Sequence, residues 1–129
     1  MRIEHVAVQV SDPSAIADWY VTHLGCSIAR SGPEPLNIRF LKDGAGQSMM
    51  ELYRNPRVAV PDYAAMDVML LHVAFVADDP AADRDRLVAA GATIVDDLTT
   101  TPAGDQIMML RDPWGLALQL VKRKDPMIG

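Results

Sequence analysis

The sequence has one cysteine, no long apolar run and no signal-like N-terminus. Because Cys26 is the single cysteine among 129 residues, an internal disulfide and a thiolate-rich zinc site are excluded, which is typical of a reducing compartment. No segment approaches the roughly 18 apolar residues needed to span a bilayer. The first residues lack the basic-then-apolar pattern of a secretion signal. We therefore expect a cytoplasmic protein with no membrane partner.

The sequence also lacks an excess of positive charge. Its net charge is −5, its pI is near 5.0, and its basic residues are scattered apart from the short run 122–124. This balance argues against nucleic acid as a partner. With 50% hydrophobic residues and a mass of 14.1 kDa, the chain can bury the core of one soluble domain.

An internal repeat is the most informative feature that the sequence does have. Residues 3–13 read IEHVAVQVSDP and residues 70–80 read LLHVAFVADDP, so His-Val-Ala and a later Asp-Pro recur at the same spacing. The second copy begins 67 residues after the first (70 − 3). This repetition predicts two similar structural modules.

The Asp-Pro pair in each copy has the features of a helix N-terminus. Asp12 and Asp79 can cap a helix by accepting hydrogen bonds from amide N–H groups, and proline fits the first helical position because no N–H is needed there. Gly25 and Gly91 can then supply the left-handed residue that ends each helix. The expected helices span residues 13–24 and 80–90.

Alternating apolar and polar residues after each helix predict three strands per module. One short strand is expected directly after each helix, near residues 27–30 and 93–96. Two more are expected around a turn in NIRFLKDGAGQSMMELY and in QIMMLRDPWGLALQLV. Each half of the chain therefore reads as strand, helix and three strands.

The predicted fold class is α+β. Two tandem βαβββ modules form a curved mixed sheet with the helices on its convex face, within a single domain. The expected divisions are module one (1–55), a linker (56–69) and module two (70–129). Because neither module covers its concave face alone, we expect two chains to pair as a homodimer.

Four potential metal ligands occupy equivalent positions in the two modules. Since side chains alternate across a strand, each of four strands places one such group on the face away from its helix. They are His5, Glu51, His72 and Gln119. Glu51 follows His5 by 46 residues and Gln119 follows His72 by 47, so the pairs could converge on one divalent cation.

Each of these residues also has a simpler interpretation. A histidine in an apolar strand is more often a hydrogen-bonded core residue than a ligand, and a glutamine on a sheet face can simply be solvated. The repeat, together with Glu51, favours the metal site over these separate explanations.

The chain resembles the vicinal oxygen chelate superfamily in its paired modules, their initial histidines, Glu51 in MMELY, and the RDPWG turn before LALQL. This superfamily includes glyoxalases, fosfomycin and bleomycin resistance proteins, extradiol dioxygenases and methylmalonyl-CoA epimerases. The resemblance covers nearly the whole chain and implies metal ligands at His5, Glu51, His72 and Gln119. The last position is usually a glutamate in the family. Glutamine can ligate through its carbonyl oxygen but cannot act as a carboxylate base.

The resemblance implies a divalent-metal-dependent, glyoxalase-like enzyme of the lyase or isomerase type, acting on a small oxygen-chelating substrate. Glu51 is then the candidate catalytic base that removes a proton next to a carbonyl. The cofactor would be Zn, Ni, Co, Mn or Fe. Two alternatives remain open: an antibiotic-binding resistance protein of the bleomycin-resistance type, and an extradiol-type dioxygenase. The resemblance favours the dioxygenase less, because dioxygenase members carry their carboxylate ligand at the position of Gln119.

Two polar residues are candidates for substrate binding. In LNIRFL, alternation with Ile38 and Phe40 toward the helix places Asn37 and Arg39 on the other face. There Arg39 could pair with a carboxylate or phosphate of the substrate, and a surface position at the sheet rim is the alternative.

Three apolar or aromatic residues are further candidates. Met49, Tyr53 and Met109 could line an adaptable apolar pocket for the small-molecule substrate. Core filling explains these side chains equally well.

Overall fold

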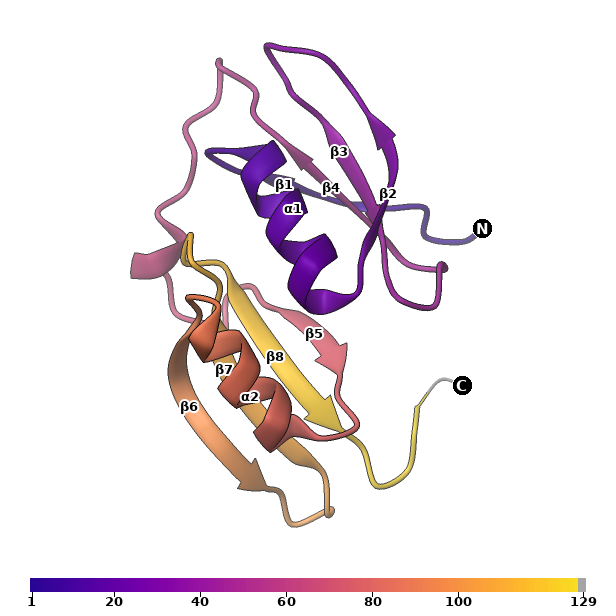
Figure 1. Cartoon of the computed structure of the whole chain (residues 1–129), viewed down its shortest axis with the longest axis vertical. Helices are drawn as coiled ribbons and strands as arrows, with labels where there is room; N and C mark the ends of the chain where they lie inside the picture. The colour runs from indigo at the N-terminus through magenta and orange to yellow at the C-terminus, as the bar shows by residue number, and fades with distance from the viewer. Residues whose placement is uncertain (128–129) are drawn as a thin grey trace. The chain divides into compact units, whose positions relative to one another are not determined.

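The computed structural model describes residues 1–127, which form two compact units. The first unit is Met1–Pro61 and the second begins at Asp62. Each unit has one long helix on one face of a four-stranded sheet (Figure 1), so the predicted α+β fold with two βαβββ modules is confirmed. No helix within residues 1–127 is long and apolar enough to cross a bilayer.

The first unit has the predicted order of elements. These are β1 (Val6–Gln9), α1 (Pro13–Leu24), β2 (Ser27–Ser31), β3 (Arg39–Lys42) and β4 (Met49–Tyr53). The strand order in the sheet is β1-β4-β3-β2, with β1 parallel to β4 and the other neighbours antiparallel. Helix α1 contacts β2, β3 and β4, and its Ile16 is buried, as are Leu41 and Leu52 of the sheet.

The second unit repeats this topology after one additional short helix. Its elements are the 3₁₀ helix η1 (Tyr63–Ala65), β5 (Val73–Val76), α2 (Pro80–Ala89), β6 (Thr93–Thr100), β7 (Gln106–Arg111) and β8 (Ala117–Lys122). The strand order β5-β8-β7-β6 matches that of the first unit, again with one parallel pair. Leu87 of α2 is fully buried, as are Leu110 and Leu118 of the sheet.

The helix ends agree with the sequence signals. The side chains of Asp12 and Asp79 each accept a hydrogen bond from the backbone N–H three residues later, at 3.0 and 3.1 Å. Gly25 has φ +70° and Gly91 has φ +106°, so both adopt the positive φ that a glycine tolerates at a helix end. Helix α2 ends at Ala89, one residue earlier than expected.

The predicted faces of β3 are wrong. Phe40 pairs with Glu51 and Arg39 pairs with the buried Leu52, and paired residues in an antiparallel ladder share a face. Phe40 therefore lies on the face with Glu51, and Arg39 lies on the side of the helix. Alternation shows which residues of a strand share a face, but not which face turns to the core; Leu41, 2% exposed, takes the core side here.

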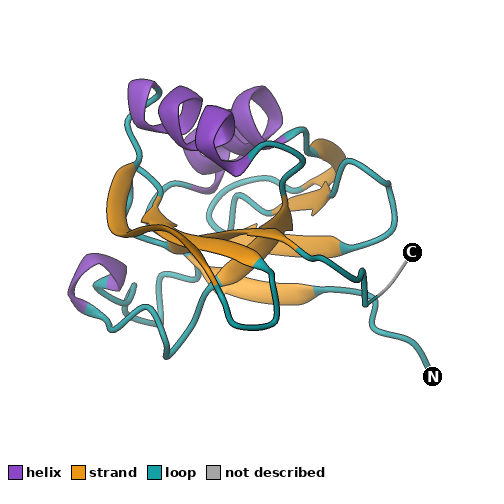
Figure 2. Cartoon of the chain, turned by 90° about the horizontal axis from the view of Figure 1, so that it is seen from below, coloured by secondary structure: helices purple, strands orange, loops and turns teal. Residues whose placement is uncertain are grey.

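The linker expected at residues 56–69 is partly structured. It contains η1, which lies on the side of the second sheet away from α2 (Figure 2). After η1, the buried side chain of Val68 packs with Met109 and Ala117 of the second sheet. The end of the linker is therefore part of the second unit, and it covers part of that unit's helix-free face.

Candidate functional site

His5 and Glu51 come together in the first unit. His5 directly precedes β1, and Glu51 lies in the middle of β4, where it pairs with Ala7. The His5 Nε2 atom is 3.0 Å from the Glu51 Oε2 atom. The two side chains are 34% and 17% exposed, so both remain partly accessible to solvent. The parallel pairing of β1 with β4 thus brings an imidazole and a carboxylate into direct contact.

The second ring nitrogen of His5 also has a partner. His5 Nδ1 contacts the carboxylate of its neighbour Glu4. The hydrogen bond that His5 Nδ1 donates to the Glu4 carboxylate is the largest cause that raises the pKa of His5. Burial opposes this shift, and the charges of Glu4 and Glu51 add to it. An imidazole between two carboxylates has the electron-rich surroundings found for histidines that bind cations.

The side chains around this pair are apolar or aromatic. The rings of His5 and Phe40 meet edge to face, with centroids 5.3 Å apart and planes at 79°. Met49 and Tyr53 lie two residues before and after Glu51 on the same strand, so they share its face and are half-buried. These residues make a partly dry surface beside the carboxylate.

His72 and Gln119 hold the equivalent positions in the second unit. His72 directly precedes β5, and Gln119 pairs with Ala74 in the register in which Glu51 pairs with Ala7. The His72 Nδ1 atom is 3.0 Å from the backbone oxygen of Val68. Both side chains are half-buried. The structural repeat therefore extends to the candidate ligands, with a neutral amide in place of the second carboxylate.

Met109 lies beside Gln119, as Phe40 lies beside Glu51. It pairs with Gln119 in the β7–β8 ladder and is 5% exposed. Because Val68 packs on it, Met109 contributes mainly to the covered part of this face.

Arg39 does not point to the candidate ligands. Its Nη1 donates to the carbonyl oxygens of Gly32 (3.3 Å), Asn37 (3.3 Å) and Ile38 (2.9 Å). The guanidinium therefore stabilises the loop between β2 and β3, and it is positioned to support this loop rather than to meet a substrate beside Glu51.

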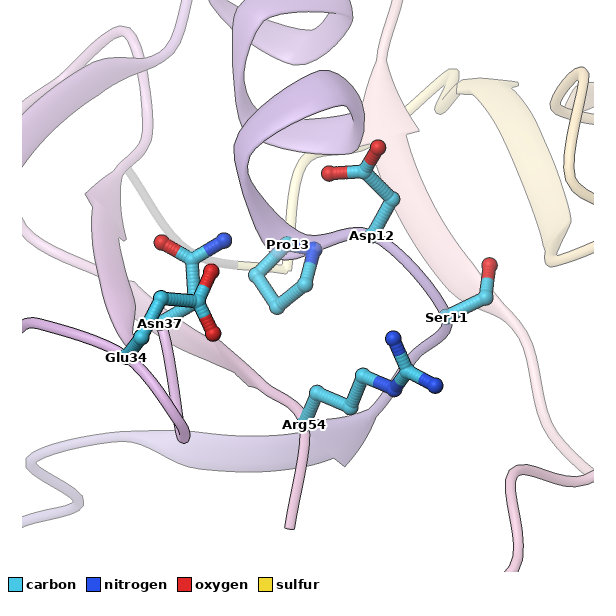
Figure 3. A pocket seen from close by; sticks show the side chains of 6 residues that line it. All are labelled: Ser11, Asp12, Pro13, Glu34, Asn37 and Arg54. Carbon is cyan, nitrogen blue, oxygen red and sulfur yellow. The ribbon is translucent and has the colours of Figure 1, made fainter. Parts of the chain in front are cut away.

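Asn37 borders a separate small pocket. It has a positive φ of 50° in the β2–β3 loop. The pocket has a volume of about 180 Å³ and is lined by Ser11, Asp12, Pro13, Glu34, Asn37 and Arg54. Glu34 and Asn37 lie on one side of it, and Ser11 and Arg54 on the other (Figure 3). It is smaller than the ~300–1,000 Å³ typical of small-molecule sites.

The first pair offers an imidazole nitrogen and a carboxylate oxygen, which are donor types that bind divalent cations. Two donors bound at about 2.0–2.2 Å to one tetrahedral Zn²⁺ lie about 3.4 Å from each other. The 3.0 Å between His5 Nε2 and Glu51 Oε2 is a hydrogen-bond or ion-pair distance, a few tenths of an ångström shorter than that spacing. Within residues 1–127, no group of three or more His, Cys, Asp or Glu side chains is gathered to hold a metal. The pair provides two donors, and a complete site needs more.

Sequence reasoning missed three contributors to these surroundings. Glu4 could have been found from its place next to His5, since adjacent carboxylates often orient a histidine. Phe40 was assigned to the wrong face, and only the register of β3 with β4 places it correctly. The Val68 carbonyl carries no sequence signal, because its position depends on how the linker folds back.

Comparison with known families identifies the class of the protein. The family model of the Glyoxalase/Bleomycin resistance protein/Dioxygenase superfamily matches residues 2–120. The chain belongs to this superfamily, which confirms the resemblance seen in the sequence. No curated protein matches the chain.

Solved structures with the same fold include three useful comparisons. SMU.1112c is 27% identical, with a TM-score of 0.73, over 95% of this chain and 98% of that one. TnmS3, an antibiotic binding protein from Streptomyces sp. CB03234, is 22% identical, with a TM-score of 0.68, over 93% of both chains. TioX from Micromonospora sp. ML1 is 24% identical, with a TM-score of 0.68, over 92% of this chain and 96% of that one.

Proposed function

We propose that the protein is a divalent-metal-dependent enzyme of glyoxalase type that transfers a proton within a small substrate carrying adjacent oxygens. The observation that carries this proposal is the His5 Nε2–Glu51 Oε2 contact of 3.0 Å, with His5 Nδ1 oriented by Glu4. His5 and Glu51 would supply half of the metal ligands, and His72 and Gln119 the other half.

The side chains of the first unit have distinct roles in this reaction. A divalent ion would polarise a substrate oxygen and stabilise negative charge on it. Glu51 accepts a proton from the carbon next to the substrate carbonyl and returns it to the adjacent carbon. Phe40, Met49 and Tyr53 reduce the access of water to the carboxylate and contact the apolar part of the substrate.

Metal analysis of single variants tests the proposal. We expect His5→Ala, Glu51→Ala and His72→Ala each to abolish tight binding of Zn, Ni, Co or Mn, because the remaining ligands cannot replace a lost carboxylate or imidazole. Circular dichroism should show that the fold is retained, since none of the three side chains faces a helix. Titration with one metal, followed by elemental analysis, measures the effect.

The third histidine provides the matched control. His23 lies in the last turn of α1, and its ring centroid is 5.1 Å from that of Trp19. His23→Ala should keep wild-type metal affinity. If all three ligand variants also keep it, the metal proposal is wrong. Bound iron that is lost on exposure to oxygen would instead favour the dioxygenase alternative.

A second candidate function is metal-free binding of an antibiotic-like molecule. It is favoured by the neutral Gln119 at the position equivalent to Glu51, and by the fold shared with the antibiotic binding protein TnmS3. A ligand that binds the folded state raises the melting temperature. Thermal shifts by such molecules in chelator-treated protein, without any shift by metals, would favour this function over the first.

A further inference from the structure

Arg111 connects the second sheet to the segment that precedes β5. Its Nη1 donates to the carbonyl oxygens of Tyr63 (2.7 Å) and Gly115 (3.1 Å), and its Nη2 donates to that of Met66 (2.6 Å). One planar guanidinium therefore holds three backbone carbonyls, which a flexible ammonium could not do with the same geometry. The backbone of residues 63–66 is fixed to the end of β7 by these bonds.

Two further contacts hold the same segment on the sheet. Gly115 has φ +94°, and a Cβ atom there would lie 2.7 Å from the backbone nitrogen of Ala64, so glycine is needed for η1 to approach this closely. At the other end of the segment, Val68 is buried against Met109. The path of the chain from η1 to Val68 is thus set by the second sheet.

The position of the Val68 carbonyl determines where His72 carries its proton. A carbonyl oxygen only accepts hydrogen bonds, so the His72 Nδ1 atom, 3.0 Å away, must carry the proton. In the neutral ring the lone pair is then on Nε2. Nε2 is the nitrogen that remains to bind a cation or accept a proton, as in metal sites where a carbonyl orients the ligating imidazole.

The first unit orients its histidine in a different way. There the partner of His5 Nδ1 is the carboxylate of Glu4, the preceding residue. The repeat places Leu71 at the position equivalent to Glu4 (4 + 67), and leucine has no acceptor in its side chain. The second unit therefore needs an acceptor from elsewhere, and the linker backbone provides it.

We propose that Arg111 is a positioning residue that holds residues 63–66 on the second sheet, so that the Val68 carbonyl keeps the His72 proton on Nδ1. The use of the His72 Nε2 lone pair as a metal ligand rests on the proposed function. The tautomer of the ring does not, and it can be measured in protein without metal.

Nitrogen-15 NMR of the metal-free protein in alkaline buffer reports the tautomer directly. In the wild type we expect the His72 Nε2 resonance of an unprotonated nitrogen. Arg111→Met keeps an unbranched apolar stem but removes the guanidinium donors, so His72 should become a mixture that includes the Nε2–H form. Arg111→Lys keeps the charge and one donor group, and should lie between the two. The His5 resonances should stay unchanged in both variants.

A second arginine of the same unit provides the control. Arg123 directly follows β8 and forms an ion pair with Asp105 at 2.8 Å. Arg123→Met should leave the His72 tautomer as in the wild type. Metal affinity should fall by about 10–100-fold in Arg111→Met and remain unchanged in Arg123→Met.

A wild-type His72 tautomer in folded Arg111→Met overturns the proposal. If that variant does not fold, Arg111→Lys decides: an unchanged tautomer overturns the proposal and a mixture supports it. If the tautomer changes in Arg111→Met but the wild type binds no metal, the positioning role is supported and the metal function is contradicted. If the wild type binds metal but the His72 tautomer is unchanged in the variants, the metal function is supported and the positioning role of Arg111 is contradicted.

Discussion

At the scale of single residues, the two units differ in charge at the position shared by Glu51 and Gln119. Each pairs with an alanine of the parallel strand, Ala7 or Ala74, and each follows the histidine of its own unit. The proposed ligand set therefore carries one negative charge instead of two. A metal held by it would be more cationic, which favours substrates with an anionic oxygen.

Gln119→Glu tests this difference in charge. If Gln119 is a neutral ligand, the added carboxylate should tighten metal binding by about 1–3 kcal/mol, because solvent partly screens the new charge. The variant could also gain isomerase activity on a hemithioacetal, since a second carboxylate becomes available as a base. Titration of both proteins with one metal, and assays with methylglyoxal plus a thiol, measure the two effects.

Gln106→Glu is the matched control for that experiment. Gln106 lies on the neighbouring strand β7, where it pairs with Lys122 rather than with Gln119. The same change of charge there should leave the metal affinity unchanged. Equal affinities of the wild type and Gln119→Glu would mean that this side chain does not reach the metal, leaving a site of three ligands.

At the scale of elements, each helix depends on its aspartate cap. The Asp12 side chain accepts the Ala15 N–H at 3.0 Å, and its removal leaves that donor without this partner at the start of α1. We expect Asp12→Ala to lower the free energy of unfolding by about 1 kcal/mol, as measured by urea denaturation. Asp18→Ala, at an exposed position of the same helix, should change it far less. Equal effects of the two substitutions would contradict the capping role.

The elements that could be predicted are those whose signals are local. Asp-Pro and glycine mark both helices within one or two residues, because capping and positive φ depend on neighbouring residues alone. The face of Arg39 could not be predicted, since strand alternation leaves the choice of face to the tertiary core. The 3₁₀ helix η1 depends on Arg111, which lies 48 residues after Tyr63. The repeat placed His5 and Glu51 at matching strand positions despite their separation in sequence, whereas the partner of His72 depends on how residues 63–68 fold back and has no equivalent in the first unit.

At the scale of the whole molecule, apolar side chains are exposed on the edge strands of both sheets. Strands β1 and β5 each end the strand order of their sheet. Val6 on β1 is 57% exposed, Val76 on β5 is 83% exposed, and Ile3 just before β1 is 86% exposed. Exposed apolar edge strands favour association with another chain. On the basis of these exposed edges we propose a homodimer.

We predict that the protein sediments as a dimer at micromolar concentration and that Val76→Lys shifts it toward the monomer. A lysine on the β5 edge would have to be desolvated in an interface that covers this strand, and edge lysines oppose strand association. Val88→Lys, on the exposed side of α2, should leave the dimer intact.

If His5 and Glu51 share a metal with His72 and Gln119 of a second chain, Val76→Lys should lose metal together with dimerisation. A wild-type monomer with full metal occupancy would contradict the shared site, and a wild-type dimer unaffected by Val76→Lys would exclude β5 from the interface.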